Sequence, residues 1–333
     1  MQTISDSLQK LVPQIPSHPL VSIVIPVYNE EEGLEQLFTR LYSSLDQLVI
    51  DLSVRYEVVF INDGSSDQSA AKLAAQFEKR PDTTRVVLFN GNFGQHMAIM
   101  AGFNYSHGDF VITLDADLQN PPEEIHRIVE LLLKGHDYVG TIREARKDSR
   151  FRRYASKAMN QLRERITKIT MTDQGCMMRG YNRRIVNLMK KSKELNTFIP
   201  ALGFTYASHP IEIKVKHEER FAGESKYSLY QLIRLNFDLV TGFSVLPLQA
   251  FSLIGFFLAL GSAALFIYLI FRRFIIGAEV EGVFTLFALN FFLMGVLLFG
   301  LGLLGEYVGR IYQQVRKRPR YVVMGVLEQD DQQ

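Results

Sequence analysis

An α/β fold with a mostly parallel sheet, followed by a helical membrane region with two spans, is the architecture that this sequence predicts. Two observations support it. Residues 20–226 alternate short apolar, β-branched runs with stretches of helical spacing, which is typical of a parallel sheet covered by helices. Residues 250–271 and 283–305 carry no charged residue, and each stretch exceeds the roughly 20 apolar residues that cross a bilayer.

The elements of the α/β part follow one another in regular alternation. The first strand is an apolar run that ends at Pro26, and the leucines of the helix after it lie three or four residues apart. A turn rich in Asn, Asp, Gly and Ser follows the second strand and can cap the next helix. Strands are expected at 21–26, 56–61, 85–89, 110–114 and 138–141, and helices at 30–45, about 67–79, 95–106 and from 121 onward.

These patterns divide the chain into five segments. A polar tail (1–19) precedes the α/β domain (20–226). Residues 227–247 have an amphipathic pattern, and this helix is expected either to lie in a membrane interface or to pack on the α/β domain. Two membrane helices (248–306) and a C-terminal segment (307–333) complete the chain.

The distribution of charge predicts an orientation in the membrane. The formal net charge of +2 says little about partners, and nothing in it suggests nucleic-acid binding. The N-terminus has no apolar signal region, and basic residues follow the second span, although Arg272 and Arg273 between the spans weaken the contrast. Cys176 is the single cysteine, so no intrachain disulfide can form. We expect a multi-pass protein of the inner (plasma) membrane, with the α/β domain and both termini cytoplasmic.

Polar residues follow directly after several predicted strands. Tyr28 and Glu30 follow the first strand, Asp63 the second, and Asp115 and Asp117 the fourth. Ligands bind outside the carboxyl ends of parallel strands, so these side chains are expected at one edge of the sheet. Two carboxylates one residue apart point the same way in extended backbone and suit Mg²⁺ or Mn²⁺ together with substrate phosphates. The alternative is two acids in a surface turn.

Two common phosphate-binding loops are missing from the places where they would be expected. The first strand is followed by Pro-Val-Tyr-Asn-Glu and not by a Gly-x-Gly-x-x-Gly turn, and the sequence has no Gly-x-x-x-x-Gly-Lys-Ser/Thr loop. A Rossmann dehydrogenase is therefore excluded. Carboxylates and a metal are expected to handle a nucleotide diphosphate instead.

Three motifs, in their order and spacing, resemble those of family 2 glycosyltransferases, which have the GT-A (Rossmann-like) fold. They are Val-Ser-Ile-Val-Ile-Pro-Val-Tyr-Asn-Glu at 21–30, Asn-Asp-Gly-Ser-Ser-Asp at 62–67 and Asp-Ala-Asp-Leu-Gln at 115–119. The following Asn-Pro-Pro-Glu, the two spans and Leu-Gly-Glu-Tyr-Val-Gly-Arg at 304–310 are similar to the polyprenyl-phosphate branch. That branch includes dolichol-phosphate mannose synthases and bacterial undecaprenyl-phosphate glucosyltransferases.

The resemblance implies a role for each matching residue. Those expected to bind the nucleotide sugar are Pro26, Tyr28, Glu30, Asp63 and Asp115. Asp115 and Asp117 are the expected ligands of Mg²⁺ or Mn²⁺, and the expected catalytic-site residues are Asp117, Gln119 and Asp173. Asn92, Gly94 and Gln95 resemble a motif that frames the donor, with helix capping as the alternative.

The acceptor implied by the resemblance is a lipid phosphate, which calls for basic residues. Residues 143–168 contain ten Lys and Arg against three Asp and Glu, and a solvated basic face is the alternative explanation. The residues expected to bind the acceptor phosphate are Arg143, Arg152, Ser156, Arg220, Ser225 and Lys226. A phosphate monoester has its second pKa near 6, so it is mostly deprotonated at neutral pH and needs little base catalysis. Asp173 is therefore expected either to act as a base or only to position a substrate.

Together these features predict inverting transfer of one sugar to a polyprenyl phosphate such as undecaprenyl phosphate. Glucose from UDP-glucose is the expected sugar; a 4-amino-4-deoxy-arabinose derivative, mannose and N-acetylglucosamine are alternatives. A processive polysaccharide synthase is the rival enzyme, but the sequence contains no tryptophan for the Gln-x-x-Arg-Trp motif of that class. A scaffold protein with an inactive transferase domain is disfavoured by the intact acids. The resemblance also implies a homo-oligomer.

Overall fold

The computed structural model describes residues 16–143, 171–173, 175–192, 198–218, 246–276, 282–316 and 319–329. These residues form two units. The first is an α/β unit that contains residues up to 218 and, from the far end of the chain, residues 319–329. The second contains two long helices between residues 246 and 316.

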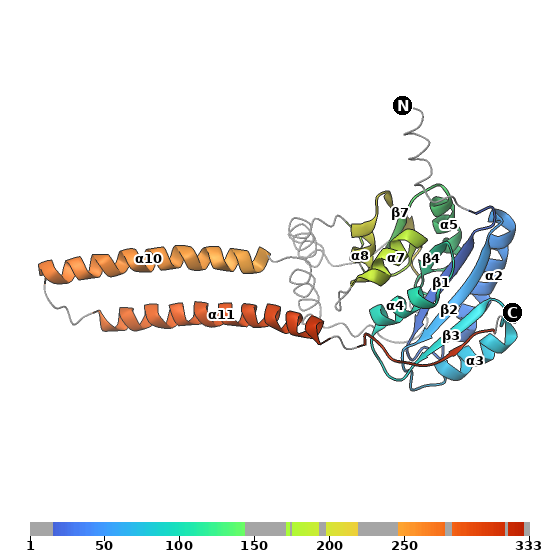
Figure 1. Cartoon of the computed structure of the whole chain (residues 1–333), viewed down its shortest axis with the longest axis horizontal. Coiled ribbons are helices and arrows are strands. Elements are labelled where there is room, and N and C mark those ends of the chain that lie inside the picture. Colours follow the sequence, from blue (N-terminus) through green and yellow to red (C-terminus); the bar gives the residue numbers. More distant parts are fainter. Residues whose placement is uncertain are drawn as a thin grey trace, which may run out of the picture. The chain divides into compact units, whose positions relative to one another are not determined.

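The α/β unit is built on one eight-stranded sheet with the order β7-β5-β6-β4-β1-β2-β3-β8 (Figure 1). The strands are β1 (Leu20–Val27), β2 (Arg55–Asn62), β3 (Thr84–Phe89), β4 (Phe110–Thr113), β5 (Tyr138–Arg143), β6 (Arg179–Asn182), β7 (Pro210–Val215) and β8 (Val323–Leu327). The five strands predicted from the sequence are confirmed. The other three, β6, β7 and β8, were not predicted.

The sheet is mixed, although its centre is parallel as predicted. β1 pairs in parallel with β2 and β4, β2 with β3, and β5 with β7. The two exceptions are the unpredicted β6, which is antiparallel to β4 and β5, and β8, which is antiparallel to β3. Because β6 runs the other way, β5 and β7 point in the same direction as β1 to β4. Six strands therefore end at one edge, and the residues that precede β6 arrive at that edge too.

Helices cover both faces of the sheet. Those of the α/β unit are α2 (Leu34–Leu52), α3 (Ser69–Lys79), α4 (Gln95–Tyr105), the 3-10 turn η1 (Pro122–Glu124), α5 (Ile125–Leu133), α7 (Arg183–Lys191) and α8 (Ile199–Tyr206). One apolar core joins α2, α3 and α5 to the sheet, and a second joins α4, α7 and α8 to its other face. Alternate residues of β1 divide between them: Ile23 and Ile25 belong to the first core and Val24 to the second.

Gly64 is required where the loop after β2 meets the loop after β3. Its φ is +67°, and a Cβ on it would lie 2.3 Å from the carbonyl carbon of Gly91. The replacement Gly64→Ala is expected to lower the free energy of unfolding by more than the ~1–3 kcal/mol that such a backbone conformation alone costs. Gly135 is the matched control, because its φ is +97° and a Cβ on it would have no atom within 4 Å. Denaturant unfolding of the two alanine variants measures the difference, and equal losses would contradict the close contact.

The second unit is a pair of helices, α10 (Leu246–Ile276) and α11 (Val283–Val315). The rings of Phe251 and Phe299 are 5.9 Å apart, and a Cβ on Gly300 would collide with the Phe251 ring, so the helices touch at this point. Among the described residues, one stretch is long and apolar enough to cross a membrane. It is Leu289–Gly309 of α11, which has a mean hydropathy of 2.0 and is only 11% buried; α10 contains the shorter apolar stretch Leu248–Leu258.

Both predicted membrane helices thus form as helices, but with longer bounds. α11 continues without a break to Val315, whereas the sequence analysis began a separate segment at residue 307. Most of the predicted amphipathic helix at 227–247 and nearly all of the N-terminal tail lie outside the described residues.

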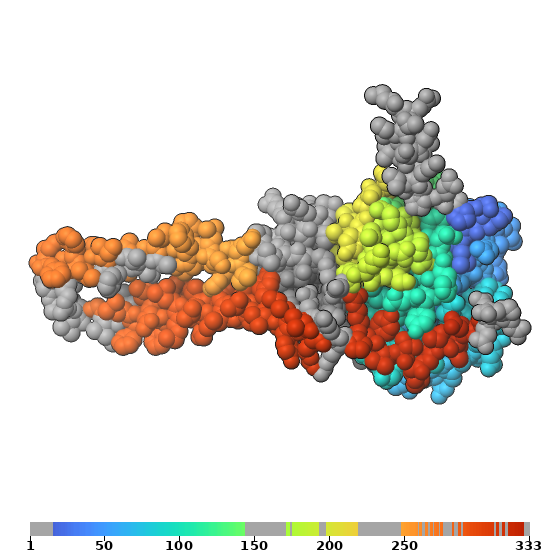
Figure 2. Space-filling model, in the orientation of Figure 1, coloured from blue at the N-terminus to red at the C-terminus, as the bar shows by residue number. Residues whose placement is uncertain are grey.

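The C-terminal segment returns to the α/β unit, which the sequence did not predict. β8 pairs with β3 from Val86↔Leu327 to Phe89↔Val323, and in Figure 2 this red segment lies on the surface of the unit. The Tyr321 ring stacks on Phe89 with a centroid distance of 4.9 Å, and the Tyr321 hydroxyl accepts a hydrogen bond from Asn104. We call residues 319–329 the C-terminal strap.

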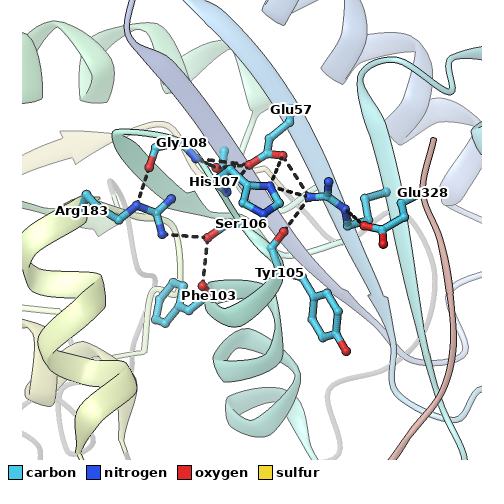
Figure 3. Close-up of polar contacts among 10 residues, drawn as sticks. Glu57, Phe103, Tyr105, Ser106, His107, Gly108, Arg183 and Glu328 are labelled. Atoms are coloured by element: carbon cyan, nitrogen blue, oxygen red, sulfur yellow. Dashed lines mark hydrogen bonds and ion pairs between the residues drawn. The ribbon is translucent and has the colours of Figure 1, made fainter. Parts of the chain in front are cut away.

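A polar cluster fastens the end of the C-terminal strap at the edge where β1 to β4 begin (Figure 3). Arg85 donates to Glu328 at 2.8 Å and to Glu57 at 3.1 Å. Burial alone would raise the pKa of Glu57, but hydrogen bonds from Ser22 and the His107 N–H and the charge of Arg85 bring this pKa below its usual value. The strap is therefore held by charge at one end and by aromatic stacking at the other.

Candidate active site

The predicted site residues that the structure describes all lie at the edge where six strands end. β1 leads to Tyr28 and Glu30, β2 to Asp63, β4 to Asp115 and Asp117, and β5 ends at Arg143. The stretch that contains Asp173 precedes β6 and reaches the same edge because β6 is antiparallel. The convergence predicted from the sequence for Tyr28, Glu30, Asp63, Asp115 and Asp117 is therefore confirmed. Arg152, Ser156, Arg220, Ser225 and Lys226 lie outside the described residues.

The loop after β1 is held by the loop after β2. Asn29, whose φ is +53°, accepts a hydrogen bond from the Ser66 N–H at 2.9 Å. The Glu30 N–H donates to the Ser69 hydroxyl at 3.1 Å. Pro26 is half-buried within β1, whereas Tyr28 is 49% exposed. The serine-rich turn and the start of α3 therefore hold the two residues that follow an exposed aromatic ring.

Asp63 is buried, and its carboxylate holds the loop before α4. Its Oδ1 accepts from the Phe93 N–H at 2.7 Å, and its Oδ2 accepts from the Gly94 N–H at 2.8 Å. Burial raises the pKa of Asp63, although these two hydrogen bonds act in the opposite direction. The structure thus gives Asp63 a definite part in shaping the 92–94 loop, and its predicted contact with the nucleotide stays a prediction.

Asp115 and Asp117 form the negative centre of the edge. Asp115 accepts hydrogen bonds from Gln95 Nε2 at 2.6 Å and from Asn120 Nδ2 at 3.3 Å. Burial raises the pKa of Asp115 to about 7, and the charge of Asp117 contributes to this rise. Burial and the like charge of Asp117 disfavour the ionised form of Asp115, and a bound cation would favour it. This environment therefore suits a cation site. Gln95, which the sequence analysis left between donor framing and helix capping, here contacts a predicted metal ligand.

The backbone after Asp117 takes an unusual turn. Leu118 is buried and has a φ of +60°, which is uncommon for a residue with a side chain. The turn lets the Gln119 N–H donate to Asp117 Oδ1 at 3.2 Å, and the Gln119 carbonyl accepts from the Glu218 N–H at 2.9 Å. The loop that carries the carboxylates is therefore tied to the segment that follows β7.

Asp173 and Arg143 form an ion pair that the sequence did not predict. Arg143 Nε lies 2.8 Å from Asp173 Oδ2, and Arg143 Nη2 lies 3.0 Å from Oδ1. Burial alone would raise the pKa of Asp173, but the hydrogen bonds and charge of Arg143 hold this pKa below its usual value. A carboxylate stabilised in this way is a poor proton acceptor. Arg143 here binds Asp173, and its predicted role at the acceptor phosphate stays a prediction.

His217 belongs to the edge, although no role for it was predicted from the sequence. It lies two residues beyond the end of β7. Its pKa is lowered by burial and by the charge of Arg143, while the charges of Asp117 and Asp173 act in the opposite direction. The signal that could have found it is its place directly after Pro210–Val215, an alternating apolar run that forms β7.

The donor set fits a hard divalent cation that takes part of its coordination from substrate. Among the described residues there is no group of three or more His, Cys, Asp or Glu side chains that could hold a metal by itself. The edge offers two carboxylates, those of Asp115 and Asp117, and the pKa of Asp115 is raised. Mg²⁺ is commonly bound through one or two carboxylates plus substrate phosphates. Asp115 and Asp117 would hold it.

Comparisons with known proteins agree with this geometry. The family described as "Glycosyl transferase family 2" matches residues 22–188. The undecaprenyl-phosphate 4-deoxy-4-formamido-L-arabinose transferase of Edwardsiella ictaluri is 50% identical over 309 residues, which cover 92% of this chain and 94% of that protein. The protein of the same name from Sodalis glossinidius is 50% identical over 312 residues, covering 93% and 94%.

One solved structure is a more distant likeness. Glucosyl-3-phosphoglycerate synthase from Mycobacterium tuberculosis, crystallised with Mn²⁺, UDP and glucosyl-3-phosphoglycerate, is 17% identical. The superposition covers 67% of this chain and 78% of the synthase chain. Its TM-score of 0.46 is too low to carry any inference about ligands. The family match and the relatives at 50% identity are sufficient: the chain belongs to glycosyl transferase family 2, as one of its polyprenyl-phosphate sugar transferases.

Proposed function

We propose that this enzyme transfers 4-deoxy-4-formamido-L-arabinose from a UDP-linked donor to undecaprenyl phosphate. The observation that carries the proposal is the pair of carboxylates Asp115 and Asp117 directly after β4 at the strand edge, where burial and the charge of Asp117 raise the pKa of Asp115 to about 7. Such a pair is completed by the diphosphate of a nucleotide sugar. The choice of sugar is supported by relatives of that name that are 50% identical over more than nine-tenths of the chain. Glucose, the sugar expected from the sequence, gives way to the stated alternative.

The donor is held by the loops after β1 to β4. Tyr28 presents an exposed aromatic ring on a backbone fixed by the serine-rich turn, which suits stacking against a base. Glu30 is expected to accept a ribose hydroxyl, and Asp63 frames the site through Phe93 and Gly94. Mg²⁺ or Mn²⁺ bound by Asp115 and Asp117 would neutralise the charge that develops on the leaving diphosphate.

The transfer needs no proton acceptor on the enzyme. An oxygen of the acceptor phosphate attacks the anomeric carbon, the bond from that carbon to the diphosphate oxygen breaks, and UDP leaves with its electron pair. With a second pKa near 6, the phosphate is already mostly deprotonated. The ion pair of Asp173 with Arg143 is consistent with this, because it keeps Asp173 ionised and oriented. We assign Asp173 to positioning substrate, and Arg152, Ser156, Arg220, Ser225 and Lys226 to the acceptor phosphate.

The second unit suits a lipid environment. Large apolar side chains are exposed on both helices, among them Phe257 (62%), Phe274 (88%) and Leu297 (62%). Apolar surface of this extent marks a membrane or protein contact. We propose that both helices enter the inner membrane and that the α/β unit lies on its cytoplasmic face. The homo-oligomer implied by the resemblance stays a prediction, which the mass of the detergent-solubilised protein would check.

The test is a donor panel on the full-length protein. Membranes that contain it are incubated with undecaprenyl phosphate, Mg²⁺ and one of several radiolabelled donors: the UDP-linked 4-formamido and 4-amino sugars, UDP-glucose, UDP-N-acetylglucosamine and GDP-mannose. We expect label from the 4-formamido sugar to enter the lipid phase with the highest kcat/KM, and we expect EDTA to abolish this transfer. Preferential transfer of any other sugar would overturn the assignment, and products longer than one sugar would favour a processive synthase.

A further inference from the structure

Arg179, the first residue of β6, is fully buried behind the site and has no part in the chemistry described above. Its Nε donates to the Cys176 carbonyl at 2.9 Å, its Nη1 to the Tyr138 hydroxyl at 2.5 Å and its Nη2 to the Asp173 carbonyl at 2.5 Å. Among the residues that the structure describes, these hydrogen-bond partners are all uncharged.

Burying a guanidinium whose described hydrogen-bond partners include no carboxylate lowers the stability of a protein core. A charge removed from water costs free energy that neutral acceptors only partly return, and an apolar side chain of similar volume is often as stable or more so. Strand pairing does not require a charged residue at position 179, because β6 pairs with β4, for example Arg179 with Thr113, through backbone hydrogen bonds. We therefore look for the role of Arg179 in the groups that accept its hydrogen bonds.

The donors of Arg179 hold the two ends of one short stretch. The carbonyls of Asp173 and Cys176 belong to residues that have no regular secondary structure, so their backbone is not fixed by a helix or strand. Asp173 is thereby held on two sides, with its carboxylate on Arg143 and its carbonyl on Arg179. A planar guanidinium reaches three separate acceptors from three different nitrogens, whereas the three donors of an ammonium group all sit on one nitrogen.

We infer that Arg179 is a positioning residue that fixes Asp173 against the reacting groups and acts on the transfer step only through Asp173. The inference rests on the proposed function, since it assumes that Asp173 meets substrate. It separates Arg179 from Tyr28, Asp63 and Asp117, because the hydrogen bonds described above for their loops do not involve the Asp173–Cys176 stretch. Asp115 is linked to this stretch only indirectly, through Asn120, which accepts from the Cys176 thiol at 3.4 Å.

The test is a double-mutant cycle on the full-length enzyme with the donor that the wild type uses. We expect Arg179→Lys to lower kcat by about 10²-fold, the loss that a small misplacement of a reacting group produces. The KM for the donor should stay within about threefold of the wild-type value, and in an Asp173→Asn background the lysine should cause no further loss beyond about threefold. If Arg179 had only a structural role, Arg179→Lys would lower kcat by a similar factor in the Asp173→Asn background and in the wild type.

Arg183→Lys is the matched control. Arg183 is also an arginine that donates to a backbone carbonyl, that of Gly108 at 2.6 Å, but it does so in the polar cluster at the opposite edge (Figure 3). It is expected to change kcat by less than about threefold. Should Arg179→Lys fail to fold, Tyr138→Phe removes one acceptor of the guanidinium and is expected to give a smaller loss that also vanishes with Asp173→Asn.

The outcomes distinguish the two proposals. If the wild type is active but Arg179→Lys lowers kcat equally with and without Asp173, Arg179 does not act through Asp173 and the inference is overturned. A rise in donor KM that matches the fall in kcat/KM would overturn it as well. A wild type that transfers no sugar from any donor overturns the proposed function first, and the positioning role with it.

Discussion

Replacing Asp117 by alanine is expected to leave a folded protein whose rate of sugar transfer is at least about 10³-fold lower, because a bound metal contributes several kcal/mol of charge stabilisation at the leaving group. Asp117 lies in a loop, and its removal also relieves the repulsion that helps to raise the pKa of Asp115. The fold should therefore survive while the cation loses a ligand. Transfer to undecaprenyl phosphate measures the rate, and binding of Mn²⁺ in the presence of UDP measures the site independently of turnover.

Asp109→Ala is the matched control for this experiment. Asp109 lies immediately before β4, at the opposite end of the same strand, where its Oδ2 accepts from the Leu20 N–H at 2.9 Å. Its loss is expected to lower the free energy of unfolding by about 1 kcal/mol without changing metal binding. If Asp117→Ala kept near-normal transfer and Mn²⁺ binding, the metal assignment would be wrong.

The second large effect is expected at Asp173. Asp173→Asn removes the negative partner of Arg143, and we expect the transfer rate to fall by about 10²-fold through loss of positioning. Donor binding should change little. Because the reaction needs no base, the pH dependence of kcat between about pH 6 and 8 should keep its shape in the variant and lose only amplitude.

The same variant makes a prediction about stability, in which the sign follows from the depressed pKa. Asp173 is ionised more readily in the folded state than in the unfolded one, so its stabilisation is fully present above the unfolded pKa, about 4, and is lost as the pH falls through the lower folded value. We expect Asp173→Asn to destabilise the protein at pH 7 by on the order of 2 kcal/mol, as for a hydrogen bond to a charged group. Denaturant unfolding at pH 7 and below about pH 4 checks this; a difference that persisted undiminished at the acid end would contradict the ion pair.

The parts of the fold that could be predicted are those whose signal is local. The strands β1 to β5 are apolar runs bounded by turns, and α2 shows a clear leucine period. The missed strand β6 has the sequence Arg-Gly-Tyr-Asn, which carries no strand signal, because its arginine is held by tertiary contacts that no local pattern records. The short β8 was missed for a similar reason, since its partner β3 lies more than two hundred residues earlier in the chain.

The site divides in the same way. The motifs predicted roles in the chemistry for Asp115, Asp117 and Asp173, and the parallel topology was enough to place the first two at the strand edge. The partner of Asp173 could not be predicted, because the choice of Arg143 between a substrate phosphate and a carboxylate depends on a distance that appears only when β5 lies beside β6. His217 was missed because a single histidine after an unrecognised strand has no motif of its own.

The C-terminal strap also constrains how many times the chain can pass through a bilayer. The chain between β7 and β8 contains α10 and α11, and both strands belong to the same sheet. A path whose two ends are fixed in one compartment can cross a membrane only an even number of times. A transmembrane α11 therefore obliges a second crossing, and α10, with its 31 residues, is long enough to supply it. Because β8 and the stacked Tyr321 hold the C-terminal strap on the α/β unit, the two helices must either both cross the membrane or both stay out of it.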